Sequence, residues 1–196
     1  DIFADKLFLQ VLAYEEFVFY IPWFSKYLVR LNTKTLKTEY WQVPDKVAME
    51  IAKFRTACIY EGRIFMFPHC GDDICIFNIE KETFICDREW LNEATKFMSK
   101  DIKNKFTQKC QIGNIVYLGN LSGSFLMKYN LSNCGYEIVL LPDNEEKIVD
   151  IIRYRNDNLL ILTWIGNIWK YNIRTGNKKC IYKYIGKIKH PYNHLF

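Results

Sequence analysis

The feature that most constrains this chain is a short phrase that occurs four times along it. In each copy an apolar pair leads into an asparagine, and a polar turn follows. The four asparagines are Asn32, Asn78, Asn130 and Asn172, which lie 46, 52 and 42 positions apart. Internal periods of roughly 40 to 50 residues are typical of repeat proteins, propeller blades among them. The sequence therefore predicts a repeat architecture.

The sequence around each asparagine repeats as well. Two apolar segments separated by a short polar turn come before the phrase, and one more strand-like segment follows it. The second segments are 17–21, 64–67, 115–118 and 159–162, and the last segments are 38–43, 83–86, 136–141 and 179–184. Four strands joined by short turns form one propeller blade. We therefore expect an all-β β-propeller of four four-stranded antiparallel blades, at about residues 7–44, 55–87, 107–142 and 151–185.

Two properties of the repeat agree with this architecture. A blade is covered on both faces by its neighbours, which explains why 64–67 is apolar at every position and not at alternate ones. Each asparagine stands where the third strand turns into the fourth, and asparagine side chains hydrogen-bond their own backbone two residues further on. We expect the four asparagines to close turns, not to bind a ligand.

One interval between repeats is longer than the others, and its composition gives the reason. In 88–103 the apolar residues stand at positions 90, 91, 94, 97, 98 and 102. This spacing places them along one side of a helix. We predict one short inserted helix at about 88–103, between the second and third blades. We expect it to pack on the face or rim of the propeller; the alternative is a helix that docks a partner.

Composition excludes several classes of protein. With 49% hydrophobic and 16% aromatic residues the chain is too apolar for disorder, and it has no apolar stretch as long as a membrane span. The net charge of +5 arises in residues 143–196, which hold ten basic and five acidic side chains. A lysine cluster of this size is usually a solvated face, so we expect neither nucleic acid nor membrane as a partner.

Seven cysteines are scattered along the chain, and no two of them form a C-x-x-C pair. This pattern favours reduced, mostly buried thiols, and reduced thiols favour a cytoplasmic location. The sequence begins at Asp1, shows no basic and apolar leader, and ends without a clear terminal cap. We interpret the chain as a portion of a larger propeller; the alternative is a complete four-bladed ring.

The common catalytic and metal-binding patterns do not occur in the sequence. There is no glycine-rich phosphate loop and no G-x-S-x-G turn. His69 and Cys70 are neighbours, but nothing orients them as a nucleophilic pair, and together with Cys75 they lack zinc-ligand spacing. Asp72 and Asp73 are adjacent, whereas glycoside hydrolysis needs two acids that face each other across a cleft. We expect no catalytic residue, no metal and no cofactor.

Residues 60–68 read Tyr-Glu-Gly-Arg-Ile-Phe-Met-Phe-Pro, and an Ile-Phe-Asn anchor and a Lys-Glu-Thr-Phe segment follow them. This pattern resembles kelch-like and WD40-like β-propeller repeats, above all the divergent propeller domains of unknown function from AT-rich Firmicutes. The resemblance covers about residues 7–185 and implies a bacterial propeller. The Gly-Gly doublet of kelch repeats and the Gly-His and Trp-Asp signatures of WD40 repeats are missing. No substrate-adaptor or signalling role therefore follows from the resemblance.

Propellers bind through loops that successive blades present at one end, because rigid sheets hold variable loops in place. We expect the loops between second and third strands to form this surface. The candidate binding residues in these loops are Trp23, Phe24, His69, Asp72, Asn120, Ser122, Trp164 and Asn167. Trp23 and Trp164 stand at the same relative place in two loops, where they either anchor a partner or pack inward over the blade.

The expected function is that of a non-catalytic binding or scaffold module that recognises a protein or peptide. The alternative is a carbohydrate-binding or degenerate glycan-active propeller in which Trp23 and Trp164 stack on sugar rings. Exposed rings beside a polar pocket favour the carbohydrate, whereas a broad apolar or charged surface favours the protein. Open blade edges also allow the chain to associate with itself.

Overall fold

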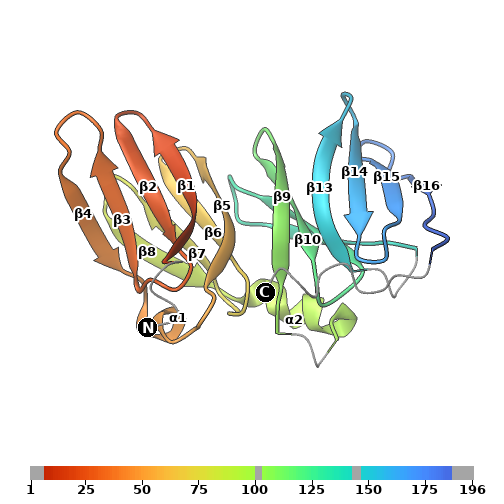
Figure 1. Ribbon diagram of the computed structural model, residues 1–196, viewed down its shortest axis with the longest axis horizontal. Helices are drawn as coiled ribbons and strands as arrows, with labels where there is room; N and C mark the ends of the chain where they lie inside the picture. The colour runs from red at the N-terminus through yellow and green to blue at the C-terminus, as the bar shows by residue number, and fades with distance from the viewer. Residues whose placement is uncertain (1–6, 100–102, 143–146, 187–196) are drawn as a thin grey trace.

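The computed structural model describes residues 7–99, 103–142 and 147–186, and these form four four-stranded antiparallel sheets. Blade 1 consists of β1 (Phe8–Tyr14), β2 (Phe17–Pro22), β3 (Tyr27–Asn32) and β4 (Thr38–Gln42), and blade 2 of β5 (Phe54–Tyr60), β6 (Arg63–Pro68), β7 (Ile74–Asn78) and β8 (Thr83–Asp87). Blade 3 consists of β9 (Phe106–Ile112), β10 (Ile115–Asn120), β11 (Phe125–Asn130) and β12 (Tyr136–Leu140), and blade 4 of β13 (Ile148–Tyr154), β14 (Asn158–Thr163), β15 (Ile168–Asn172) and β16 (Lys178–Tyr182). The blades stand side by side in chain order (Figure 1).

Three buried clusters hold neighbouring blades together. They contain Phe19, Leu28, Ile64 and Met66 between blades 1 and 2, Phe65, Phe67, Val116 and Met127 between blades 2 and 3, and Tyr117, Leu126, Ile161 and Trp169 between blades 3 and 4. Successive residues of β6 go to opposite clusters, because side chains alternate between the two faces of a sheet. The prediction that 64–67 is apolar because both of its faces are covered is confirmed.

The anchor asparagines close the turns between third and fourth strands. Asn32 Oδ1 accepts hydrogen bonds from the backbone N–H groups of Lys34 and Thr35, both at 2.9 Å. The carboxamide oxygens of the other three accept backbone N–H groups as well: Asn78 from Lys81, Asn130 from Ser132, and Asn172 from Arg174 and Thr175. The predicted turn-closing role is confirmed.

The expected helical insertion contains α2 (Glu89–Ala94) and the 3₁₀ turn η2 (Thr95–Phe97). Trp90 is fully buried, and its ring lies 4.9 Å from that of Phe106. The helix therefore packs on the propeller beside blade 3. It ends earlier than predicted, since Met98 already has extended backbone, and residues 100–102 lie outside the described residues. A second short helix, α1 (Asp45–Ala48), was not predicted, because its four residues are too few to show a period.

The two blades at the ends of the row each leave one face uncovered by the other described blades (Figure 1). We call these the outer faces. The register aligns Val11, Tyr20, Val29 and Tyr40 across the outer face of blade 1, and Ile152, Leu160, Lys170 and Lys179 across that of blade 4. The side chains of Val11, Tyr40 and Ile152 are 57%, 69% and 55% exposed. The residues at the equivalent positions of blade 2 belong to the buried clusters, for example Ala57 at the position of Val11 and Cys58 at that of Ile152.

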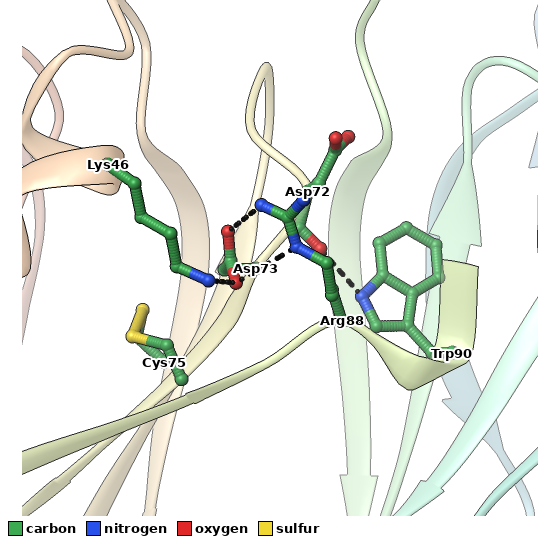
Figure 2. Close-up of a disulfide and its surroundings, with 7 residues drawn as sticks. Lys46, Asp72, Asp73, Cys75, Arg88 and Trp90 are labelled. Carbon is green, nitrogen blue, oxygen red and sulfur yellow. Dashed lines mark hydrogen bonds and ion pairs between the residues drawn. A yellow bond between two sulfur atoms is a disulfide. The ribbon is translucent and has the colours of Figure 1, made fainter. Parts of the chain in front are cut away.

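Cys75 and Cys86 form a disulfide within blade 2 (Figure 2). The register of β7 and β8 places the two residues directly opposite each other, with their Cα atoms 4.2 Å apart. The expectation of reduced thiols is wrong for this pair, because the hairpin between them brings together residues that are 11 positions apart. The five free cysteines are Cys58, Cys70, Cys110, Cys134 and Cys180.

Candidate functional site

One end of the row of blades carries α1, α2 and the loops 23–26, 69–73, 121–124 and 164–167 (Figure 1). We call this end the loop face. A series of backbone hydrogen bonds runs along this face, each from an N–H group to a carbonyl oxygen at 2.6 to 3.0 Å. The donor and acceptor residues are Trp23 and Leu7, Lys53 and Trp23, His69 and Lys53, Lys105 and His69, Leu121 and Lys105, and Trp164 and Lys147. The residue after each second strand is thereby joined to the start of its own blade. Trp23 and His69 are also joined to the start of the next blade.

The candidate residues from the sequence divide by burial. His69, Asn120, Ser122 and Asn167 are buried, and Trp23, Phe24, Asp72 and Trp164 are partly exposed. The hydrogen-bonded series places Trp23, His69, Leu121 and Trp164 at equivalent positions. Blades 1 and 2 bring Trp23, Phe24 and His69 together, whereas Trp164 and Asn167 belong to the loop of blade 4.

The ring of Trp23 is the centre of an aromatic and cationic cluster. It lies 5.8 Å from the ring of Phe24 and 5.0 Å from that of His69. The guanidinium of Arg55, on β5, lies 5.9 Å from the centre of the Trp23 ring, a contact of about 0.5–1 kcal/mol at exposed sites. We call Trp23, Phe24, Arg55 and His69 the Trp23 cluster. Arg55 was missed in the sequence because its partner belongs to another blade.

His69 is the buried member of the Trp23 cluster and is 6% exposed. Its Nδ1 lies 3.1 Å from the carbonyl oxygen of Phe106 and donates to it. Burial lowers the pKa of His69, the bond to Phe106 opposes this, and the charges of Arg55 and Lys105 lower it further. The imidazole is therefore neutral near pH 7, and it links blade 2 to β9 of blade 3.

Two buried lysines follow the same repeat. Lys53 and Lys105 stand immediately before β5 and β9 and are 2% and 8% exposed. Lys53 Nζ donates to the carbonyl oxygen of Glu50 at 2.6 Å, and Lys105 Nζ to that of Lys103 at 2.9 Å. Burial lowers the pKa of Lys53. This feature was missed in the sequence although its pattern is visible there, since a lysine stands immediately before the first strand of blades 2, 3 and 4.

Asp73 ties α1 and the start of α2 to blade 2 (Figure 2). Its side chain is 5% exposed and accepts hydrogen bonds from Lys46 and from Arg88, the latter at 2.9 Å. Burial raises the pKa of Asp73, but the bonds from Arg88 and Lys46 outweigh it and hold the pKa below its ordinary value. The neighbouring Asp72 is more exposed, and its carboxylate lies 3.5 Å from Lys105.

The loops of blades 3 and 4 are stiffened by their own polar side chains. Asn120 Oδ1 accepts the backbone N–H and the hydroxyl of Ser122, at 2.8 and 3.0 Å. Asn167 Oδ1 accepts the backbone N–H of Tyr184 at 2.8 Å and so fixes the segment after β16. Asn120 and Asn167 are therefore buried residues that hold the loops of the loop face in place.

The described part of the chain holds neither a cluster of metal ligands nor a membrane-spanning helix. Within residues 7–99, 103–142 and 147–186, no group of three or more His, Cys, Asp or Glu side chains is arranged to hold a metal ion. In the same ranges, no helix is long and apolar enough to cross a membrane.

No protein-family model matches the sequence, and no curated protein matches it. Solved structures match in fold. The extracellular domain of the putative one component system BT4673 from B. thetaiotaomicron gives a TM-score of 0.68 at 9% identity, over 88% of this chain and 23% of that chain. PorZ of Porphyromonas gingivalis, an essential bacterial surface component of the type-IX secretion system, gives 0.60 at 14% identity, over 88% and 22%. The N-terminal domain of Nup159 gives 0.56 at 9% identity, over 91% and 44%.

Sheet topology and these likenesses define the class of protein: the chain has a β-propeller fold. It spans less than half of the length of each of the three chains. At these identities the likeness concerns the fold alone.

Proposed function

We propose that the chain is a non-catalytic binding module that recognises a protein or peptide through the Trp23 cluster. The observation that carries this proposal is a partly exposed tryptophan ring with a phenylalanine ring and a guanidinium beside it. Tryptophan and arginine are enriched among the residues that contribute most to binding energy at interfaces. The backbone of Trp23 is hydrogen-bonded to two blades, so the ring stands on a rigid support and little entropy is lost on binding.

The chemistry around the ring favours a peptide over a sugar. The contacts of Trp23 within the cluster are aromatic or cationic: Phe24, His69 and Arg55. The guanidinium of Arg55 suits a carboxylate of a peptide, because a guanidinium and a carboxylate form strong, charge-assisted hydrogen bonds. Carbohydrate binding is the alternative, and the experiment below includes a result that would favour it.

The experiment selects binders from a displayed library of random peptides and measures their affinities by fluorescence polarisation. We expect Trp23→Ala and Arg55→Ala each to weaken binding by at least about tenfold, the loss typical of a residue that dominates an interface. Trp164→Ala, at the equivalent position of blade 4, is the matched control and leaves the affinity unchanged. Thermal unfolding of each variant verifies that the fold is intact.

Three results contradict the proposal. One is peptide binding that neither Trp23→Ala nor Arg55→Ala changes. Another is a loss caused by Trp164→Ala alone, which places the surface on blade 4. The third is binding on a glycan array that Trp23→Ala abolishes, together with no selected peptide, which favours the carbohydrate-binding alternative.

The compartment is a separate proposal. The scattered cysteines favoured the cytoplasm, but the Cys75–Cys86 disulfide supports an oxidising compartment, where such bonds persist. Two of the similar structures are an extracellular domain and a bacterial surface component. We propose an oxidising compartment in place of the cytoplasm. Alkylation of the denatured, unreduced protein from its native source is then expected to modify the five free cysteines and not all seven.

Two further proposals concern origin and assembly. The repeat pattern and the bacterial source of two similar structures support a divergent kelch-like or WD40-like propeller from a bacterium, with Firmicutes as the proposed source. The exposed apolar side chains on the outer faces of blades 1 and 4, such as Val11, Tyr40 and Ile152, support association of the chain with a second copy.

A further inference from the structure

A cavity beside η2, blade 3 and the start of blade 4 shares no residue with the Trp23 cluster. Its volume is about 600 Å³. It is lined by Lys96, Phe97, Met98 and Ser99 from η2 and the residues after it, by Ser122, Gly123 and Ser124 from the loop between β10 and β11, and by Leu140 and Lys147. Four separate segments of the chain therefore converge on it.

The loop that forms one wall of this cavity holds polar atoms whose hydrogen bonds are not made. In the described part of the chain, three buried side-chain atoms have no hydrogen-bond partner, and two of them, Asn120 Nδ2 and Ser124 Oγ, belong to residues 120–124. Ser124 lines the cavity and is 6% exposed. A buried polar group without a partner costs about 1–3 kcal/mol, and native proteins retain few of them. A ligand that contacts the Ser124 hydroxyl would supply the missing partner.

The charge of the cavity indicates the kind of ligand. Both charged residues that line it are lysines, Lys96 and Lys147. Neither ammonium forms an ion pair with a carboxylate of the described residues. Two cationic donors and a free hydroxyl suit an acceptor-rich, negatively charged group, since charge-assisted hydrogen bonds are the strong ones.

The wall of the cavity is held in place before any ligand binds. The carbonyl oxygen of Ser122 accepts the backbone N–H of Ser99 at 2.6 Å. At Gly123 a Cβ atom would clash with the carbonyl oxygen of Phe97, so only glycine allows the loop and η2 to approach this closely. Because these contacts fix the two segments against each other, binding requires little reorganisation.

From these features we propose that the cavity binds an oxyanion group, a carboxylate, a phosphate or a sulfate, carried by a small molecule. Lys96 and Lys147 neutralise its charge, and the Ser124 hydroxyl donates a hydrogen bond to one of its oxygens. The volume is within the range of pockets that hold small molecules, so the oxyanion is one part of the ligand. The proposal does not depend on the peptide-binding role of the Trp23 cluster.

The test titrates the whole chain with inorganic phosphate, sulfate or acetate at constant ionic strength, with chloride as the balancing salt. Binding is followed by amide chemical shifts in ¹⁵N spectra. We expect saturable shifts in residues 120–124 with at least one of the three anions, and the preferred anion distinguishes a tetrahedral group from a carboxylate. Lys96→Gln and Lys147→Gln are each expected to weaken the affinity by about fivefold or more, as for a lost charge-assisted bond.

The matched control for the lysines is Lys128→Gln. Lys128 is paired with Glu137 on blade 3, away from the residues that line the cavity, and its loss leaves the affinity unchanged. An absence of saturable shifts with all three anions overturns the proposal. So does an affinity that falls equally in Lys128→Gln and in Lys96→Gln, because that result reports only the net charge of the protein.

Ser124→Ala gives a second, independent test, in which the direction of the change in unfolding temperature is measured. Without anion, this substitution removes an unpaired buried hydroxyl and is expected to raise the unfolding temperature, while it weakens anion binding. Ser25→Ala is the control, because the buried Ser25 hydroxyl is paired with the backbone of Tyr27 and its loss lowers the unfolding temperature. A Ser124→Ala variant that is destabilised and keeps its anion affinity overturns the role of Ser124.

Discussion

In the four turns that the anchor asparagines close, one position has a positive φ in every blade. It holds Leu36, Glu82, Cys134 and Gly176, with φ of 58°, 54°, 61° and 74°. This left-handed conformation costs an L-residue about 1–2 kcal/mol, and in three of the four blades the residue is not glycine. The repeat therefore retains backbone strain at a position that glycine relieves in blade 4.

Leu36→Gly is expected to raise the free energy of unfolding by about 0.5–1 kcal/mol. The strain that is relieved exceeds the greater freedom that glycine has in the unfolded chain. Leu36 is 74% exposed, so the change removes little packing. Urea denaturation measures the effect, and Gly176→Leu, at the same position of blade 4, is expected to lose about 1 kcal/mol. A Leu36→Gly variant less stable than the parent contradicts this account.

His69 gives the protein a dependence on pH. Its pKa in the folded state lies below the ordinary value of 6.5, so the unfolded chain binds more protons as the pH falls below about 6.5. Stability is therefore present above that pH and is lost as the pH falls toward the folded pKa. We expect the unfolding temperature of the parent to fall between pH 7 and pH 5 more steeply than that of His69→Asn, which still offers an N–H to Phe106. Parallel slopes contradict the prediction.

At the residue scale, the sequence predicted features whose partners are local. The anchor asparagines bond backbone groups two or three residues away, and that signal is visible in one phrase. Arg55 and Trp23 meet because two blades are neighbours, and Cys75 meets Cys86 because a register pairs them. Such contacts depend on the arrangement of strands, which residue types and spacing alone do not specify.

At the scale of the strand pair, one ladder position distinguishes blade 4 from blades 1 and 3. Arg30 faces Glu39 across β3 and β4, and Lys128 faces Glu137 across β11 and β12, with ion-pair distances of 2.6 and 3.0 Å. The corresponding pair of β15 and β16 is Lys170 and Lys179. Like charges directly opposite each other destabilise a sheet.

Lys179→Glu is therefore expected to stabilise the chain. The gain is about 0.2–1 kcal/mol, the range for an opposite-charge cross-strand pair, and it shrinks at high salt because the pair is near the surface. Chemical denaturation at low and high ionic strength measures it. Lys178→Glu is the control: the ammonium of Lys178 lies 5.8 Å over the Tyr171 ring, so that variant loses a contact. Equal effects of the two substitutions contradict the pairing argument.

Strands were easier to predict than helices at this scale. Each of the four sheets was visible as apolar segments between polar turns, and the all-apolar segment 64–67 indicated coverage on both faces. The apolar positions predicted one short helix at about 88–103, whereas α2 and η2 end at Phe97. The buried Trp90 explains the packing, since its Nε1–H donates to the carbonyl oxygen of Asp72 at 2.9 Å. That contact belongs to blade 2, outside the helical pattern.

At the scale of the whole molecule, the two outer faces are complementary. We call the face of a blade toward the preceding blade its leading face and the face toward the next blade its trailing face. Each internal interface joins the trailing face of one blade to the leading face of the next. Blade 4 retains a trailing face and blade 1 a leading face, and both carry exposed apolar side chains such as Ile152 and Val11. A second copy placed head to tail therefore repeats the geometry of the internal interfaces.

We expect the chain to associate as its concentration rises, as measured by size-exclusion chromatography with light scattering. Tyr40→Glu, on the outer face of blade 1, is expected to shift the protein toward monomer because it places a charge in the apolar contact. Met49→Glu is the matched control, since Met49 is 81% exposed but lies beyond β4 in the link to blade 2. A protein that is monomeric at every concentration, or that both variants affect alike, contradicts this assembly.

Main-chain hydrogen bonds join neighbouring blades at the positions of Trp23 and His69. Every residue except proline supplies the same donor and acceptor, so these main-chain bonds do not depend on the identity of the side chain. The four equivalent positions hold tryptophan, histidine, leucine and tryptophan. A change of side chain at Trp23, Leu121 or Trp164 therefore leaves the main-chain bonds in place, whereas a change at His69 also removes its bond to Phe106. The first three positions are thus suited to the engineering of new recognition chemistry.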